Sequence, residues 1–433
     1  MDALHSLRAI GTPTPPAADR HEAGLPGLLG AVGSALLAST NASNDVQDRL
    51  TDLADRYGRP ELRVFVLPTL ILVEDPTVSP TQTSVFPVES NTLRLDQVGA
   101  VEHIVRHAFE DRPDPDAVVA QIAAASARKP RFGPLLSVFG YFLLTLGFGL
   151  MLNPTLTALP VYAVLGVAVG AIQLYGSRVS TLALVLPVFT AFAVTLLVSL
   201  VAKPLVHDEV LRLVAPSLVS FLPGLTLTIA AVELTAGQVM AGASRLVYGI
   251  ARLGLLAFGV FAATSVVGHP AAGATSPQLG IWAPWIGILL VSVGYYIYSS
   301  APRRSLLWIL YALVVAYSAQ LLGNVLLGSG LSGFVGALAV VPAVYLAARF
   351  RAAPPPSVML TCAYWLLVPG SMGFIGLTEA ASGTSGAADA LLKTFGSLLA
   401  IAMGMLIGGG LSKDVTAVRQ AYHDAGDDRE TST

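Results

Sequence analysis

The sequence predicts a mainly α-helical membrane protein, with ten transmembrane helices in two inverted five-helix repeats preceded by a small cytoplasmic α+β domain. Three observations support this fold class. The 433 residues are 54% hydrophobic and only 12% charged, whereas soluble domains carry about 25% charged residues. Beyond residue 134, the apolar segments approach the roughly 20 residues that cross a bilayer. Motifs in the first half of this region recur in the second half at an almost constant offset.

The domain boundaries follow changes in composition along the chain. Residues 1–27 are predicted to be a disordered, Pro-rich lead that lacks the apolar core of a signal peptide. Residues 28–130 form the cytoplasmic domain, 131–268 and 269–412 the two membrane repeats, and 413–433 a disordered polar tail. The net charge of −2 gives no indication of a nucleic-acid partner.

Periodicity within residues 28–130 predicts both helices and strands. A helical pattern runs from Leu28 to Tyr57, where Gly58 is a stop signal. β-rich runs at 62–66, 69–73 and 83–88 predict three strands. Helical spacing returns at 95–109 and 116–125. The second of these three helical stretches carries potential metal ligands on one face: Glu102, His103, His107 and Asp111. Surface histidines are far commoner than ligands, so no metal and no cofactor are predicted.

Ten apolar segments are predicted to span the membrane. They lie near 135–152, 156–174, 180–202, 211–233, 245–267, 279–299, 305–322, 326–348, 357–378 and 388–411. Every second connection, beginning before the first span, is rich in basic residues: Arg128, Lys129, Arg131, Arg178, Arg245, Arg303, Arg304, Arg349, Arg351, Lys413 and Arg419. The other connections hold only Lys203, Arg212 and Lys393. Because positive residues favour the cytoplasm, both termini are predicted to be cytoplasmic.

The repeat rests on four matched groups of residues, each separated by 146 or 147 positions. The first-half members are Gly140 with Gly147, Gln173 to Gly176, Pro223-Gly224 followed by Glu233, and Tyr248-Gly249; the second-half members are Gly287 with Gly294, Gln320 to Gly323, Pro369-Gly370 followed by Glu379, and Phe395-Gly396. Since each unit has five spans, the second copy enters the membrane from the opposite face. Inverted repeats of this kind are typical of transporters, although a duplication in a static membrane protein is the alternative.

The Pro-Gly pairs fall inside the fourth and ninth spans. Proline removes a backbone donor, and glycine tolerates non-helical angles. Pro223-Gly224 and Pro369-Gly370 therefore predict helices broken into half-helices, with a simple kink as the alternative. The positive end of each second half-helix could receive a bound anion.

Glu233 and Glu379 each lie ten residues beyond a break. A carboxylate in hydrocarbon is costly, so it predicts a role in binding protons or a substrate ammonium. The alternative places both at span ends, solvated by headgroups. Further candidates for substrate contact are the polar residues near the breaks and span ends: Thr226, Thr228, Ser371, Gln173 and Gln320. For the two glutamines, hydrogen bonds between helices are the competing interpretation.

Several protein classes lack support in the sequence. Phosphate-loop, HExxH and GxSxG motifs do not occur, so ATP-driven transport and the matching hydrolases are not predicted. Ser39 or Thr40 with His103 or His107 is the only nucleophile–base combination for a membrane-anchored hydrolase. The single cysteine, Cys362, fits a packed core thiol.

A further group of motifs comprises residues 36–40 (Leu-Leu-Ala-Ser-Thr), Asp45-Val46, Tyr57-Gly58, the β-rich stretch and long helix after them, and the Pro-Gly and Glu pairs in both halves. In these motifs the chain resembles the bacterial threonine/serine exporter family. The resemblance extends over about residues 28–411. One departure is Thr40-Asn41, where the family pattern leads us to expect a glycine. Related exporters split between two subunits are associated with succinate.

The resemblance implies a multi-pass protein of the bacterial cytoplasmic membrane that exports threonine and serine, driven by protons. Its partners would be a small-molecule substrate, protons and the lipid bilayer. Assembly into a homo-oligomer is a further possibility. A dicarboxylate exporter is the closest alternative, because two half-helix ends could each hold one carboxylate. A passive channel is a further alternative. In all but the hydrolase interpretation the protein is not an enzyme.

Overall fold

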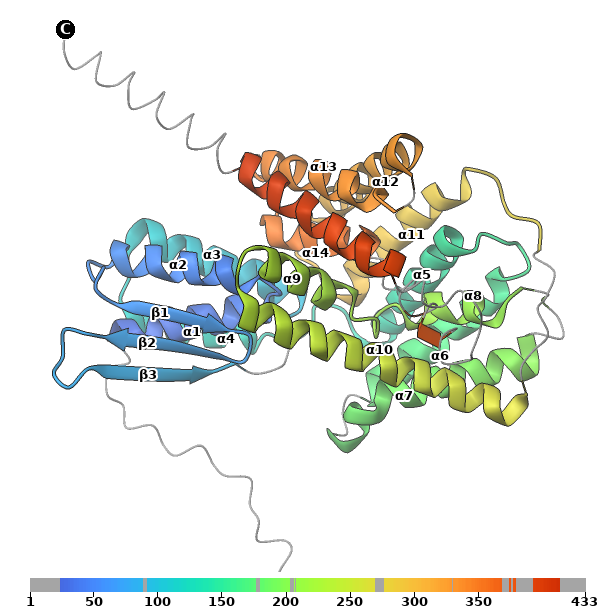
Figure 1. The fold of residues 1–433 in the computed structure, drawn as a ribbon, viewed down its shortest axis with the longest axis horizontal. Helices are drawn as coiled ribbons and strands as arrows, with labels where there is room; N and C mark the ends of the chain where they lie inside the picture. Colours follow the sequence, from blue (N-terminus) through green and yellow to red (C-terminus); the bar gives the residue numbers. More distant parts are fainter. Residues whose placement is uncertain are drawn as a thin grey trace, which may run out of the picture.

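The computed structural model describes residues 24–88, 92–176, 180–202, 206, 208–268, 276–328, 330–367, 374, 377–378 and 392–412. Residues 24–126, called the head below, combine four helices with a small sheet. The described residues between 134 and 412, called the bundle, are mainly helical and extend away from one side of the head (Figure 1). Each part has its own large apolar core.

The sheet of the head is an antiparallel meander of three strands, β1 (Arg63–Leu67), β2 (Leu70–Asp75) and β3 (Gln82–Pro87). In the register, Arg63 lies opposite Glu74, and Leu70 lies opposite Pro87. The strands lie within two residues of the ranges that periodicity predicted. Their buried residues face helix α1 (Gly24–Ala38), which approaches closely because Gly30 and Gly33 leave room for Phe86 and Ile71.

The predicted helical stretch from Leu28 to Tyr57 is two helices in the structure, α1 and α2 (Ser43–Arg56). α1 begins at Gly24, inside the predicted disordered lead. The chain turns between the two helices at Thr40, whose φ of 63° is in the left-handed region that favours glycine. This is the position where the family pattern predicts a glycine. The Asn41 amide supports the turn by donating to the Leu36 carbonyl at 2.9 Å.

Two further helices complete the head, α3 (Leu95–Asp111) and α4 (Pro115–Ser126). The Asp114 side chain caps α4 by accepting from the Ala117 N–H at 3.2 Å. The first turn of α3 contacts the bundle, because the Leu95 N–H donates to the Ser299 carbonyl at 3.2 Å. The head is therefore attached to the bundle directly as well as through the chain.

The bundle divides into two series of helices along the chain. The first series is α5 (Pro134–Leu152), α6 (Leu159–Gly176), α7 (Ser180–Leu197) with the π-helix η2 (Val198–Ala202), α8 (Val210–Val214), the 3-10 helix η3 (Ala215–Leu218), α9 (Gly224–Thr235) and α10 (Val239–Val267). The second series is α11 (Ala283–Tyr298), α12 (Leu306–Leu327), α13 (Ser332–Ala347), α14 (Pro356–Leu367) and a last helix, Leu392–Ser412.

Among the described residues, six helices are long and apolar enough to cross a membrane: Pro134–Leu152, Leu159–Gly176, Val185–Ala202, Val239–Val267, Leu306–Leu327 and Leu392–Ser412. They match the first, second, third, fifth, seventh and tenth predicted spans. The sixth and eighth, α11 and α13, are apolar but have 16 residues each. The fourth is divided into α8, η3 and α9, and the ninth is described only in part.

Helices α5 and α11 cross at two pairs of glycines. A Cβ atom on Gly140 would lie 3.0 Å from the Gly294 carbonyl oxygen, and one on Gly147 would lie 2.7 Å from the Gly287 oxygen. The lower-numbered glycine of one helix meets the higher-numbered glycine of the other, so the two helices run antiparallel at the crossing. The four glycines let the two backbones approach more closely than side chains would allow.

Candidate substrate site at the broken helix

The fourth predicted span is interrupted between η3 and α9. Backbone bonds from Phe221 to Leu218 (2.9 Å) and from Leu222 to Val219 (3.3 Å) end the first part. α9 then begins at Gly224, with Pro223 in the N-cap position and no side-chain cap. Because the first N–H groups of a helix have no partner within it, this end of α9 presents backbone donors that the helix itself does not satisfy.

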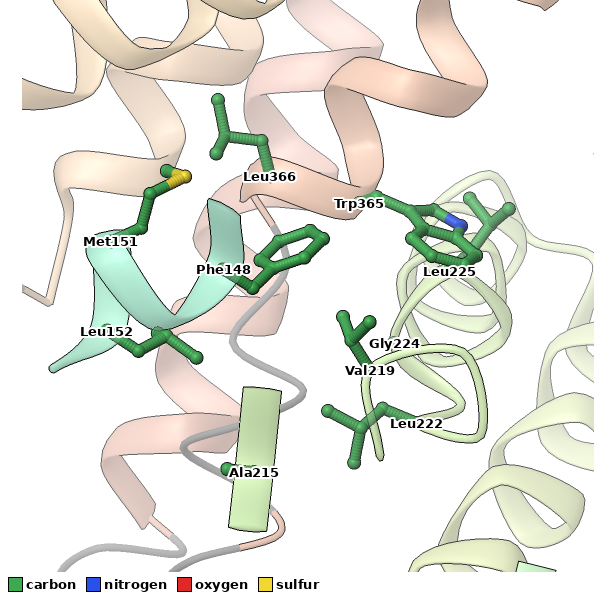
Figure 2. A pocket seen from close by; sticks show the side chains of 10 residues that line it. All are labelled: Phe148, Met151, Leu152, Ala215, Val219, Leu222, Gly224, Leu225, Trp365 and Leu366. Carbon is green, nitrogen blue, oxygen red and sulfur yellow. The ribbon is translucent and has the colours of Figure 1, made fainter. Parts of the chain in front are cut away.

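A cavity of about 70 Å³ lies at this uncapped end of α9. Gly224 and Leu225 of α9 form part of its wall, and Phe148 of α5 lies opposite them (Figure 2). Trp365 and Leu366, near the end of α14, close a further side. The cavity thus joins the break in the fourth predicted span to the helix that precedes the second Pro-Gly pair. Its wall is mainly apolar, and its uncapped helix end suits a small anionic group.

A chain of polar side chains runs beside the break and includes Gln173. The Gln173 side chain accepts from the Tyr298 hydroxyl at 2.5 Å and donates to the Ser220 hydroxyl. Tyr141 is fully buried and lies 2.8 Å from the same serine oxygen. It also donates to the Ser217 carbonyl at 2.6 Å. Gln173 therefore connects α6 and α11 to the segment that leads into the break.

The other polar candidates occupy separate places. Thr226 is half-buried in the first turn of α9, while Thr228 is fully buried. The Thr228 hydroxyl has no hydrogen-bond partner among the described residues. Gln320 lies on α12 against Gly336 of α13, which also contacts Leu367 at the end of α14. Gln320 thus lies near the end of α14 in the second half, much as Gln173 lies near the break in the first.

The structure places Glu233 at the opposite end of α9 from the cavity. The nine residues from Gly224 to Glu233 rise about 14 Å along the helix axis, so the carboxylate does not line the cavity. Glu233 is fully buried, and its Oε1 accepts from the Ser43 N–H of α2 at 2.8 Å. Its Oε2 lies 3.1 Å from Nε of Arg245 on α10, an ion pair without hydrogen-bond alignment. Arg245 carries a positive charge, and the Ser43 N–H lies at the positive N-terminal end of α2.

Glu233 is consequently part of the contact between head and bundle. Ala42, which precedes Ser43, packs with Ile229, Val232 and Ala402 of the bundle in a small apolar cluster. This cluster surrounds the carboxylate with low-dielectric material, in which a charge must be paired. α9 thus connects two sites, with the cavity at its first turn and the head at its last.

The polar residues predicted in the head lie away from the cavity. Glu102 pairs with Arg49 at 3.1 Å, and His107 Nδ1 lies 2.6 Å from Asp111. Within the described parts of the chain, no group of three His, Cys, Asp or Glu could hold a metal ion. The proposed hydrolase nucleophiles donate to backbone carbonyls instead of a histidine: Ser39 to Ala35 at 2.7 Å and Thr40 to Ser39 at 2.6 Å.

Both burial and the pairing with Glu102 affect the pKa of Arg49. Desolvation alone would lower the pKa of the Arg49 guanidinium, but the neighbouring Glu102 carboxylate outweighs it and raises the pKa. Arg49 is therefore always charged, and its pairing with Glu102 ties α2 to α3 within the head.

Four predicted residues of the second half lie outside the described residues: Pro369, Gly370, Ser371 and Glu379. α14 ends at Leu367, just before them. The described wall of the cavity therefore includes Gly224 of the first Pro-Gly pair and the end of α14, which leads to the second pair.

A second buried carboxylate, Asp208, was not predicted. It lies in the connection before α8 and contacts residues that follow α5 and precede α11, whereas the opposite end of α11 meets the head at Leu95. It accepts from the Thr155 hydroxyl at 2.6 Å, the Ser276 N–H at 3.0 Å and the Asn153 amide at 3.4 Å. The same connections meet in a β-bridge between Thr155 and Gln278. The sequence offered one signal, an acidic residue beside an apolar span.

A comparison with protein-family models matches residues 28–267 to ThrE, described as "Putative threonine/serine exporter". The chain belongs to this exporter family. The match covers the head and the first predicted repeat and confirms the resemblance drawn from the sequence. Together with the six long apolar helices, it identifies a multi-pass membrane protein whose family exports small molecules. Comparisons with curated proteins and with solved structures found no match.

Proposed function

We propose that this protein is a proton-coupled secondary exporter of threonine and serine that works by alternating access between inverted repeats. The observation that carries the proposal is the cavity between the uncapped N-terminus of α9 and the end of α14. These elements come from equivalent places in the two halves of the sequence. A site at such a position is accessible from either side when the halves rock against each other.

The glycine crossing supports the inverted arrangement. Gly140 and Gly287 are equivalent in the repeat, as are Gly147 and Gly294. Gly140 meets Gly294, and Gly147 meets Gly287. A two-fold axis relating two identical surfaces produces this reciprocal pattern, in which residue i meets j and j meets i. We infer a pseudo-two-fold axis that passes between α5 and α11.

A second pair of contacts agrees with the repeat. Gly259 of α10 lies against the Val188 carbonyl of α7, and Gly404 of the last helix lies against the Phe334 carbonyl of α13. The two contacts are separated by 145 and 146 positions, close to the repeat offset. The fifth and tenth predicted spans thus pack on the third and eighth in the same way, which supports ten spans in two units.

In this proposal the substrate carboxylate binds at the first turn of α9. Free N–H groups and the positive end of the helix dipole favour a carboxylate there. Thr226, in the first turn of α9, and Gln173, which is hydrogen-bonded to Ser220 just before the break, are assigned to the hydroxyl or ammonium of a small amino acid. The small volume of the cavity, about 70 Å³, favours threonine or serine over a bulky amino acid.

Coupling to protons is assigned to the glutamates. In the conformation described, the Glu233 carboxylate accepts a hydrogen bond from the Ser43 N–H and forms an ion pair with Arg245. Since α9 carries both the cavity and Glu233, a shift of α9 would loosen these contacts and expose the carboxylate to protons. Glu379, its counterpart in the second half, completes the proposal. We expect Glu233→Gln and Glu379→Gln each to abolish proton-driven flux; unaltered export by both variants would refute the assignment.

The test is counterflow in liposomes that contain the purified protein. Liposomes loaded with unlabelled threonine should accumulate labelled threonine, and those loaded with succinate should not accumulate labelled succinate. Gly224→Leu, which introduces a side chain into the wall of the cavity, should abolish the exchange. Gly254→Leu is the matched control, because a Cβ atom on Gly254 meets nothing within 4 Å.

Each outcome of this experiment has a defined meaning. Exchange of succinate without threonine would replace the amino-acid substrate by a dicarboxylate. Uptake that neither saturates nor depends on internal substrate would indicate a passive channel. Normal exchange in Gly224→Leu would remove the cavity from the transport path.

A further inference from the structure

A second cavity opens between the head and the bundle. It shares no lining residue with the cavity at the broken helix. Its volume is about 420 Å³. One wall is α3 of the head, at Asp96 and Gly99. The other walls are chain segments that connect bundle helices, including Pro302 and Pro355. It borders the contact where α3 meets the bundle, since a Cβ atom on Gly99 would lie 3.0 Å from Pro302.

The charges of this cavity are mainly positive. Arg128, Arg131 and Arg303 line it and come from two separate segments of the chain. None of the three is paired with a carboxylate among the described residues. The single acidic residue of the wall, Asp96, pairs with Arg94 at 3.1 Å. Three cationic side chains therefore surround the cavity without a matching anion.

Contacts of two of these arginines leave their charge uncompensated. Arg131 donates to the Tyr296 hydroxyl at 2.7 Å, and its guanidinium lies 4.9 Å from the centre of the Phe132 ring. These neutral partners orient the Arg131 side chain and supply no negative charge. The backbone that carries Arg128 is fixed to the head, because Arg94 donates to the Arg128 carbonyl at 2.5 Å.

The cavity lies at the ends of several apolar helices. Arg131 precedes α5 by three residues, Arg303 lies between α11 and α12, and Pro355 immediately precedes α14. In a bilayer these helix ends would reach the headgroup region. α14 also directs its N-terminus toward this edge, which adds a positive helix end to the arginines.

Arginines at helix ends also follow the general preference of positive charge for the cytoplasmic side. That preference explains their sign, but it does not gather them around a concave surface between two domains. Arg349 and Arg351 obey the same preference, are exposed, and do not line the cavity. They therefore distinguish a binding site from a general excess of positive charge.

We propose that this cavity binds a phosphate-bearing anion that bridges the head and the bundle. Guanidinium groups bind phosphate oxygens through two parallel hydrogen bonds, and basic pockets beside membrane helices bind anionic lipid headgroups. The ligand is the headgroup of an anionic phospholipid or a free phosphate compound. The inference uses neither the cavity at the broken helix nor the transported substrate.

The test measures binding to the purified full-length protein. One arm places the protein in nanodiscs of phosphatidylcholine with increasing phosphatidylglycerol and measures the retained lipid by native mass spectrometry. The other arm titrates pyrophosphate into protein in uncharged detergent and measures the heat released. The test variant is Arg128→Gln with Arg303→Gln, and the control is Arg349→Gln with Arg351→Gln, which removes the same charge.

We expect the test variant to bind about 30-fold more weakly, because each charge near such a surface is worth about 1 kcal/mol and 1.4 kcal/mol is tenfold. The control variant should bind as the parent does. Selective loss in the nanodisc arm identifies a lipid, and selective loss in the pyrophosphate arm identifies a soluble ligand. Equal weakening in both variants, or no binding in either arm, overturns the proposal. The thermal unfolding midpoint of each variant verifies that it is folded.

Discussion

The two ends of the bundle each bury one carboxylate, and they hold it differently. Glu233, at the head, is fully buried and faces a guanidinium and the N-terminus of a helix. Asp208, at the far end, is 2% exposed and accepts hydrogen bonds from a hydroxyl, an amide and a backbone N–H. The first joins two domains through charge, and the second joins three connections through neutral donors. Removing each carboxylate should therefore have different consequences.

The largest expected effect is that of Glu233→Ala. It leaves Arg245, whose side chain is only 15% exposed, without its partner, and breaking a buried pair costs about 3–5 kcal/mol. Chemical unfolding of the purified protein in detergent should show this loss. Replacing Glu233 and Arg245 together by methionine should restore most of it, because no buried charge then remains. If Glu233→Ala alone costs less than about 1 kcal/mol, charge does not hold this junction.

Asp208→Asn should cost less, about 1.5–3 kcal/mol, the value of hydrogen bonds to a charged group. The substitution keeps the shape of the side chain but loses its charge. Hydrogen exchange should increase in the connections that contain Thr155 and Ser276 and stay unchanged in the head. Increased exchange in α2 would contradict the separation between the two ends.

A pH dependence should distinguish the two carboxylates further. Burial alone would raise the pKa of Asp208, but hydrogen bonds from Thr155, Ser276 and Asn153 outweigh it and lower the pKa below 3.8. A carboxyl with a lowered pKa stabilises the folded state above its ordinary pKa, and this contribution disappears as pH falls through the lowered value. The stability difference between the parent and Asp208→Asn should stay constant from about pH 8 to 5. It should shrink only in stronger acid, and a gap that closes near neutral pH would contradict this.

The smallest expected effect concerns an exposed ion pair in the head, Arg63 with Glu74 at 3.7 Å. The Arg63 side chain is 66% exposed, so water screens the pair. Arg63→Gln should change stability by less than about 0.5 kcal/mol, measured in the same unfolding experiment. This comparison shows whether the stability loss in Glu233→Ala comes from burial of the ion pair or from ion pairing in general. A cost as large as that of Glu233→Ala would remove the contrast.

Local chemistry made several elements predictable. Pro223 lacks an N–H, so the interruption before Gly224 was visible in two adjacent letters. The strands were predicted because their runs are rich in β-branched and aromatic residues, which suit a half-buried sheet. The division between α1 and α2 was missed, because Thr40 occupies a left-handed position for which its side chain gives no signal. α11 and α13 were predicted longer than they are, since apolar residues continue beyond the helix ends.

Candidate site residues were predictable to a different extent. Of the residues that line the cavity, the sequence singled out Gly224 but not Trp365, because an aromatic residue in an apolar run does not show what it faces. Glu233 was noticed as a costly charge, although its partner Ser43 contributes only a backbone N–H. Any residue except proline at this position of α2 could provide that group. No side-chain pattern could therefore have identified the contact.

By itself the sequence determined the membrane class, the exporter family and the interruption of the fourth predicted span, and it predicts the repeat. These follow from hydrophobic length and from the backbone chemistry of proline and glycine, which act over neighbouring residues. Only the tertiary structure decided that Glu233 meets Ser43 across 190 positions, and that Leu225 and Trp365 enclose one cavity. Buried charges and cavities depend on which distant surfaces pack together, and the packing of the whole chain sets those contacts.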